Sequence, residues 1–185
     1  MLRLKELKMK KFDNEKLVFN NATFSNFARI EKLELIFYIS KNIYTTKEVI
    51  AEAKRGIKKK PRLQSIVDSV SRGQIKVQTL KKINNILWMN GLIQEGRLGS
   101  GEISAMALAK ELGGIFITDE EKATKKAVSE GIGILEADTL GLNISNKNKF
   151  KDTVIFLEIL KKKRIISQRD FNNIRILLSQ ENFIF

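Results

Sequence analysis

Two acidic clusters bracket an otherwise apolar stretch, SGEISAMALAKELGGIFITDEE, at residues 100–121. Glu102 stands near the start of a run of small residues, and Asp119, Glu120 and Glu121 follow the apolar run IFIT. Carboxylate oxygens are ligands for hard divalent cations, and a bound cation can orient and deprotonate water for attack on a phosphodiester. Acids are also favoured in the first turn of a helix, so each cluster taken alone is equally compatible with helix capping.

Two further side chains with oxygen ligands belong to the same hypothesis. Asn20 follows the apolar run LVF, and Glu52 lies one turn beyond Glu48 on the same face of a predicted helix. Ligands of an open parallel sheet bind beyond the carboxyl ends of its strands, so we expect Asn20 and Asp119 at one rim. Acids gathered there repel each other unless a cation lies between them. In the simpler interpretation, Glu48 and Glu52 pair with nearby Lys or Arg, and Asn20 bonds the backbone of the turn that it begins.

The composition restricts the metal and the class of protein. Cys and His are both absent, which removes disulfides and the usual zinc ligands and leaves Mg²⁺ or Mn²⁺ as the expected cofactor. The length of 185 residues fits a single domain at 17–185 after a basic extension at 1–16. The chain has no run of about 18 apolar residues, and its first residues lack the apolar segment of a secretory signal. We therefore expect a cytoplasmic protein with no membrane association.

The formal net charge of +13 and the pI near 9.9 favour a polyanionic partner, with RNA as the first candidate. A genome biased towards Lys, Ile and Asn would also raise the charge. The cations that follow Glu52 could track an RNA backbone towards the acids, or they could form a solvated loop. They are Lys54, Arg55, Lys58, Lys59, Lys60 and Arg62. A second basic group at 161–164 has the same two interpretations, and Trp88 or Phe24 could stack on a base, although such aromatics more commonly belong to the core.

Apolar runs, Gly and Pro predict an alternation of strands and helices, which indicates a parallel sheet. Strands are expected at 17–20, 42–44, 75–80, 115–118 and 132–136. Helices are expected at 24–35 with a break, 47–56, 61–73, 102–112 and 120–130. Residues 81–95 have a helical pattern, but their Asn and Gly residues predict an interruption. Two C-terminal helices, at 151–167 and 168–180, are expected to form a hairpin.

Taken together, these segments resemble a PIN domain, the fold of metal-dependent ribonucleases that include toxins of the VapC type. The resemblance rests on VFNNATFSNFARI, VIAEAKRG, LGSGEISAMALAKELGGIFITDEEKATKKA and ILEADTLGL. The best agreement is with small prokaryotic proteins in which a Gly-Glu pair begins the helix of the third acid. The resemblance implies a three-layer α/β/α sandwich with a central parallel sheet and a C-terminal helical hairpin. It also implies RNA hydrolysis with Mg²⁺ or Mn²⁺, homodimers and a small antitoxin partner.

Carried over by position, the resemblance assigns catalytic and metal-binding roles to residues of this chain. They are Asn20, Glu52, Glu102 and Asp119, with Glu120 as a neighbouring metal ligand and Thr118 as a support. The family expects Asp where this chain has Asn20, so one negative charge is lost and we expect weaker metal binding. Three functions stay open. They are a ribonuclease, a PIN-like RNA-binding protein with impaired catalysis, and a DNA-binding or ribosome-associated domain whose acids only cap helices.

Overall fold

A computed structural model describes Phe12, residues 14–136, and the single residues Lys161, Gln168, Phe171, Asn172 and Ile176. The basic extension at 1–16 therefore lies largely outside the described residues. The expected C-terminal hairpin and the second basic group also fall outside them, apart from these single residues.

The centre of the fold is a five-stranded parallel sheet in the order β3-β2-β1-β4-β5. Its strands are β1 (Leu17–Phe19), β2 (Ile43–Thr45), β3 (Lys76–Val77), β4 (Ile115–Ile117) and β5 (Gly133–Leu135). The register aligns Leu17 with Ile43 on one side and with Ile115 on the other. All three residues of β1 are buried, because a central parallel strand is covered on both faces.

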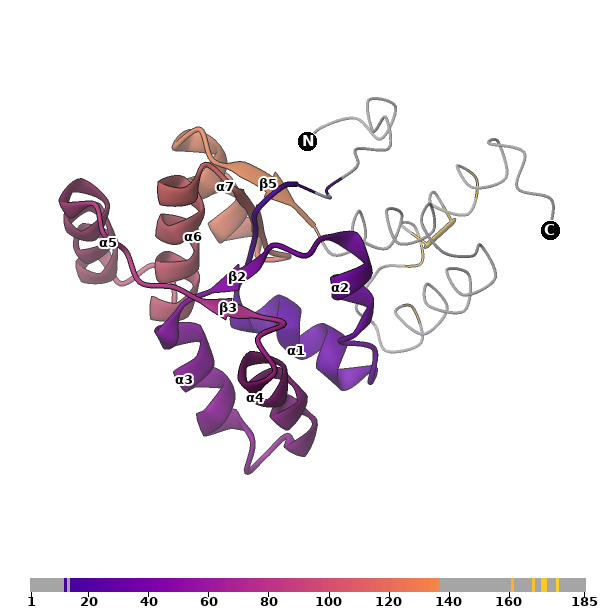
Figure 1. Ribbon diagram of the computed structural model, residues 1–185. Helices are drawn as coiled ribbons and strands as arrows, with labels where there is room; N and C mark the ends of the chain where they lie inside the picture. The colour runs from indigo at the N-terminus through magenta and orange to yellow at the C-terminus, as the bar shows by residue number, and fades with distance from the viewer. Residues whose placement is uncertain are drawn as a thin grey trace.

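Helices connect these strands and form the outer layers (Figure 1). They are α1 (Asn21–Arg29), α2 (Leu35–Ile39), α3 (Lys47–Gly56), α4 (Gln64–Ser71), α5 (Ile83–Glu95), α6 (Ser100–Leu112) and α7 (Glu121–Ser129), with a 3₁₀ turn at Pro61–Leu63. The strand order runs outwards from β1 to β3 and then resumes at β4 on the other side of β1. Right-handed crossovers therefore place α1 to α4 over one face and α6 and α7 over the other. The expected α/β/α sandwich around a parallel sheet is confirmed.

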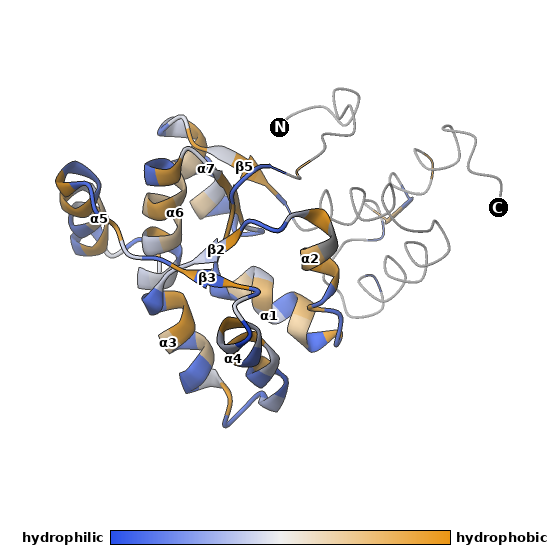
Figure 2. Cartoon of the chain, in the orientation of Figure 1, coloured by the Kyte–Doolittle hydropathy of each residue, from blue (hydrophilic) through white to orange (hydrophobic). Residues whose placement is uncertain are grey.

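The core joins the strands to the apolar faces of the helices. Figure 2 shows that hydrophobic and hydrophilic residues alternate along these helices. Phe24 is fully buried and stacks on Phe19, with ring centroids 4.8 Å apart. The suggestion that Phe24 stacks on a base is therefore wrong. Small residues let α6 lie close to β1 and β4, and every residue from Ile103 to Ala109 is buried.

Capping residues determine where the helices begin and end. Thr46 caps α3 by accepting a hydrogen bond from the Val49 backbone N–H at 3.4 Å. Gly113 ends α6 with a φ of 59°, a left-handed conformation that costs glycine least. The predicted break in the first helical region is confirmed, because it forms two helices, α1 and α2.

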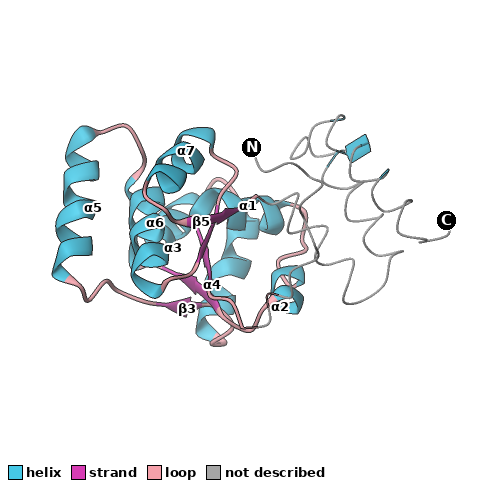
Figure 3. Ribbon diagram, turned by 90° about the horizontal axis from the view of Figure 1, so that it is seen from above, coloured by secondary structure: helices cyan, strands magenta, loops and turns pink. Residues whose placement is uncertain are grey.

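Two predictions in the middle of the chain are wrong. Helix α5 is continuous over 13 residues. The chain that enters it is held by the carboxylate of Glu111, which accepts hydrogen bonds from the backbone N–H groups of Lys81 and Lys82 and from Asn85 Nδ2. These contacts anchor the start of a helix that its Asn and Gly residues disfavour. The strand expected at 75–80 is reduced to Lys76–Val77, which pairs only with β2 at the edge of the sheet. Figure 3 shows α5 at the periphery of the molecule, and its main contacts are with α6.

None of the helices in the described part of the chain has the length and apolar character needed to cross a membrane.

Candidate functional site

The strand order reverses between β1 and β4, and the side chains that follow these two strands lie next to each other. Asn20 follows β1 and Thr118 follows β4. Asn20 Nδ2 donates a hydrogen bond to Thr118 Oγ1 at 3.1 Å across this point. Open α/β sheets bind ligands at such a reversal, beyond the carboxyl ends of the strands.

Asn20 is fully buried and both ends of its amide are used. Its Oδ1 accepts a hydrogen bond from the Thr23 backbone N–H at 2.9 Å, which makes Asn20 the N-cap of α1. Thr118 Oγ1, which accepts from Asn20, also accepts from the Glu120 backbone N–H at 3.2 Å. The structural interpretation of Asn20 is therefore confirmed, and the residue also fixes the loop that follows β4.

Glu52 reaches from α3 to the start of α6. Its Oε1 accepts a hydrogen bond from the Gly101 backbone N–H at 2.9 Å, and Ser100 Oγ lies 3.5 Å from the same atom as a second donor. Free N–H groups and the helix dipole make the first turn of a helix favourable for a carboxylate. A second link joins the same helices, because Thr46 Oγ1 and Ser104 Oγ are 2.8 Å apart. Glu52 is thus part of the α3–α6 contact, rather than a solvated residue paired with Lys or Arg.

Gly101 is what allows Glu52 this position. A Cβ at residue 101 would lie 2.5 Å from Glu52 Oε1 and 2.6 Å from Oε2. Both distances are far below van der Waals contact, so any larger residue displaces the carboxylate. The Gly-Glu pair therefore serves two acids, because its glycine leaves room for Glu52 and its glutamate is Glu102.

We expect Gly101→Ala to lower the free energy of unfolding by about 1–2 kcal/mol, because Glu52 loses its hydrogen bonds at the start of α6. Urea denaturation followed by circular dichroism measures this change. Gly91→Ala is the matched control, since Gly91 is also helical but has no atom within 4 Å of an added Cβ. Alanine should stabilise that exposed position by up to about 1 kcal/mol. Equal effects of the two substitutions would contradict this role of Gly101.

Glu102, in the first turn of α6, is half-buried and interacts electrostatically with two other carboxylates. Its Oε2 accepts a hydrogen bond from the Gly99 backbone N–H at 3.2 Å. Burial raises the pKa of the Glu102 carboxyl, and the negative charges of Glu120 and Glu52 raise it further, against the lowering effect of the Gly99 bond. Three of the predicted acids, Glu52, Glu102 and Glu120, are therefore close enough to interact electrostatically.

Asp119 lies at the same rim but has a different partner. Asn26 of α1 donates a hydrogen bond from Nδ2 to Asp119 Oδ2 at 3.2 Å. The adjacent acids differ in role, because Glu121 forms an ion pair with Lys125 at 2.6 Å on the surface of α7. The helix-surface interpretation therefore accounts for Glu121. Asn26 and Ser100 are not predicted as site residues from the sequence, although Ser100 directly precedes the Gly-Glu pair.

The donor chemistry at this rim suits a hard divalent cation. All the candidate ligands are oxygen atoms, and a cation would relieve the repulsion that raises the pKa of Glu102. Within the described residues, no three acidic side chains are grouped closely enough to hold one ion as they stand. The carboxylates of Glu102, Glu52 and Asp119 each accept a hydrogen bond from a nearby N–H group instead, so a bound ion would compete with these hydrogen bonds.

The cations predicted to bind RNA lie at the end of α3 and in the turn after it. Arg62 forms an ion pair with Glu31 at 2.8 Å and donates a hydrogen bond to the Arg29 carbonyl at 3.0 Å. The other five are exposed and make no side-chain hydrogen bond or ion pair with the described residues. They are Lys54, Arg55, Lys58, Lys59 and Lys60.

The comparison with protein families agrees with the sheet order and the acidic rim, since a family model described as a PIN domain matches residues 16–177. The chain belongs to the PIN-domain family. A comparison with curated proteins gives no match. PIN domains have a nuclease-type fold and typically depend on divalent metal ions, and in this PIN domain Asp119 and Glu120 follow β4 at the strand reversal.

Proposed function

We propose that this PIN domain is a metal-dependent endoribonuclease that hydrolyses RNA phosphodiesters. The observation that carries the proposal is the half-buried position of Glu102 in the first turn of α6, where burial raises the pKa of its carboxyl and the charges of Glu120 and Glu52 raise it further. A chain with a net charge of +13 has enough cations to neutralise isolated acids, yet the charges that act on Glu102 are those of two other acids. Such an arrangement stores repulsion that a divalent cation relieves.

Each residue has a separate role in this proposal. Glu102, Asp119 and Glu120 hold Mg²⁺ or Mn²⁺, with the Asn20 amide oxygen as a neutral fourth donor. The ion supplies an activated water molecule and charge stabilisation at the leaving oxygen. Thr118 holds Asn20 and the Glu120 backbone in place through its hydroxyl group. Glu52 contributes negative charge and positions the first turn of α6.

The proposed substrate is RNA, because the chain is strongly basic and five exposed cations lie at the end of α3 and in the turn after it. In this proposal those cations contact the RNA backbone. A role as the toxin of a toxin–antitoxin pair, a homodimer and a cytoplasmic location belong to the same proposal.

The test is cleavage of a labelled single-stranded RNA with Mn²⁺, with Mg²⁺ and with EDTA. We expect cleavage by the wild-type protein only with a divalent ion. Asp119→Asn should lower the rate about tenfold, since Glu120 beside it retains a carboxylate. Asp68→Asn is the control, because Asp68 is an acid on α4 whose partner is Gln64 and should not affect the rate. Metal-independent cleavage, or equal rates for the two variants, would contradict the proposal.

A second candidate is an RNA-binding PIN domain with impaired catalysis. The hydrogen bonds of Asn20 favour it, because both ends of the amide are engaged by protein groups. An inert wild-type protein that gains cleavage on Asn20→Asp would support this candidate over the first.

A further inference from the structure

A hollow of about 380 Å³ lies between α5 and α7, beside the loop that leads into α6. Its polar lining is mostly cationic, with Arg97 from the loop and Lys122, Lys125 and Lys126 from α7, opposed by the single acid Glu95. Leu92 and Leu98 contribute apolar surface to the same hollow. Sequence patterns do not predict this hollow, because Arg97 lies in a loop and Lys122 lies 25 residues later on the surface of another segment.

Two of the four cations have no local partner. Lys125 forms an ion pair with Glu121, and Lys126 forms one with Glu130 at 2.8 Å. Arg97 and Lys122 are exposed and form no side-chain hydrogen bond or ion pair within the described part of the chain. The hollow therefore has excess positive charge that an anionic ligand can neutralise.

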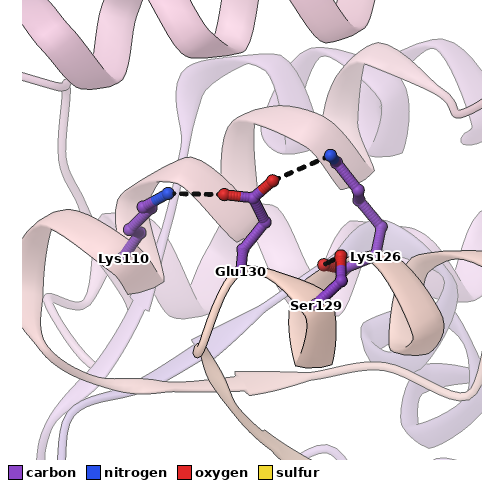
Figure 4. A network of polar contacts seen from close by, with 4 residues as sticks. All are labelled: Lys110, Lys126, Ser129 and Glu130. Atoms are coloured by element: carbon purple, nitrogen blue, oxygen red, sulfur yellow. Dashed lines mark hydrogen bonds and ion pairs between the residues drawn. The ribbon is translucent and has the colours of Figure 1, made fainter.

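One wall of the hollow is held by a charged network that Figure 4 shows. Glu130 accepts from Lys110 Nζ at 2.7 Å and from Lys126 Nζ at 2.8 Å. These two bonds lower the pKa of Glu130 to about 2, so the carboxylate stays ionised and the network persists at neutral pH. The Trp88 ring lies 4.5 Å from Lys110 Nζ and 5.9 Å from Lys126 Nζ. Trp88 is the only tryptophan, so its fluorescence reports on the wall of the hollow.

Residues that line the hollow are neighbours in sequence of residues at the acidic rim. Arg97 and Leu98 come immediately before the first turn of α6, where Glu102 lies. Lys122 lies in the first turn of α7, immediately after the acids that follow β4. An RNA strand with one phosphate at the acidic rim can therefore extend over the hollow, because the loop before α6 and the first turn of α7 carry cations next to the acids.

We propose that this hollow binds the phosphates of single-stranded RNA next to the phosphate that is cleaved. The placement relative to the cleaved bond and the choice of RNA as the ligand rest on the proposed nuclease function, whereas the binding of an anionic ligand in the hollow does not. Arg97 and Lys122 contact phosphates, and Leu98 contacts the apolar surface of a sugar or base. RNA fits better than an acidic peptide, because the proposed chemistry of the adjoining acidic rim acts on phosphodiesters.

The test measures binding without turnover. Fluorescence anisotropy of a labelled oligouridylate in EDTA gives Kd over a range of salt concentrations, and Trp88 emission is followed in parallel. We compare the double variant Arg97→Gln/Lys122→Gln with Lys32→Gln/Lys41→Gln, which removes the same charge from the surface between α1 and β2. The hollow variant should bind about tenfold more weakly, and its salt slope should fall by about 1.4, since each phosphate contact on a single strand contributes about 0.7. The control should change Kd by less than about twofold, and RNA should alter Trp88 emission.

Three outcomes would overturn this assignment. They are equal weakening by the two double variants, an unchanged Kd for the hollow variant, and RNA failing to compete with an oligoglutamate peptide bound there. Thermal unfolding checks that both variants are folded. Because EDTA prevents metal-dependent cleavage, specific binding by a protein that never cleaves RNA would reject the nuclease proposal and leave the RNA site supported.

Discussion

Glu102→Gln is expected to make the metal-free protein more stable and the nuclease about 100-fold slower. Glutamine keeps an oxygen that can accept from the Gly99 N–H group but carries no charge, so the repulsion from Glu120 and Glu52 disappears. We expect the melting temperature in EDTA to rise by about 1–3 °C. The loss of cleavage follows because the proposal places Glu102 at the centre of the acidic group. Differential scanning fluorimetry and the RNA cleavage assay measure the two effects.

The stability effect of Glu102→Gln should depend on pH in a defined direction. Because the pKa of Glu102 is raised in the folded state, protonation of this residue favours folding, and that contribution is lost as the pH rises through the folded-state pKa. The advantage of glutamine is therefore greatest at neutral pH and shrinks in acid. Glu121→Gln is the control, since Glu121 is exposed and paired only with Lys125. A less stable Glu102→Gln protein at neutral pH in EDTA would contradict the inferred repulsion.

The effect of metal provides a readout that is independent of RNA. A ligand that binds only the folded state raises its stability. Mn²⁺ should therefore raise the melting temperature of the wild-type protein and have a smaller effect on Glu102→Gln. If Mn²⁺ stabilises both proteins equally, Glu102 is not a metal ligand.

The sequence predicts the strand and helix order because these elements depend on local signals. The apolar runs LVF and IFI can only be buried, and Gly113 can end a helix without strain. Alternation of helices and strands then implies parallel pairing, which brings Asn20 and Thr118 together at the reversal. The family pattern adds the acidic positions.

The contacts made by the site residues could not be predicted, because their partners lie far away in the chain. Glu52 contacts Gly101, which is 49 residues away, and Asn26 contacts Asp119 across 93 residues. The hydrogen bonds from Lys81 and Lys82 to Glu111, which anchor the start of α5, likewise span 30 and 29 residues. Local patterns predict which residues are candidates, whereas tertiary structure decides what each carboxylate binds.

Asn20→Ala is expected to lower the free energy of unfolding by about 2–4 kcal/mol. The substitution removes the N-cap of α1, and it leaves the Thr23 N–H group without its acceptor at a position that solvent does not reach. It also removes the hydrogen bond to Thr118 that joins the ends of β1 and β4. Chemical denaturation measures this loss. Asn21→Ala is the control, because Asn21 is the next residue and its side chain accepts only a 3.4 Å hydrogen bond from Ser25.

Asn20→Asp separates the structural role of Asn20 from its role in metal binding. Aspartate can still accept from the Thr23 N–H group, and the Thr118 hydroxyl can rotate to donate to the second carboxylate oxygen. In EDTA we expect lower stability than for the wild-type protein, since a buried negative charge is added near Glu102 and Glu120. Mn²⁺ should more than restore the stability of Asn20→Asp and raise its cleavage rate above that of the wild type. If Mn²⁺ affects neither the stability nor the rate of Asn20→Asp, this rim of the sheet does not bind the metal.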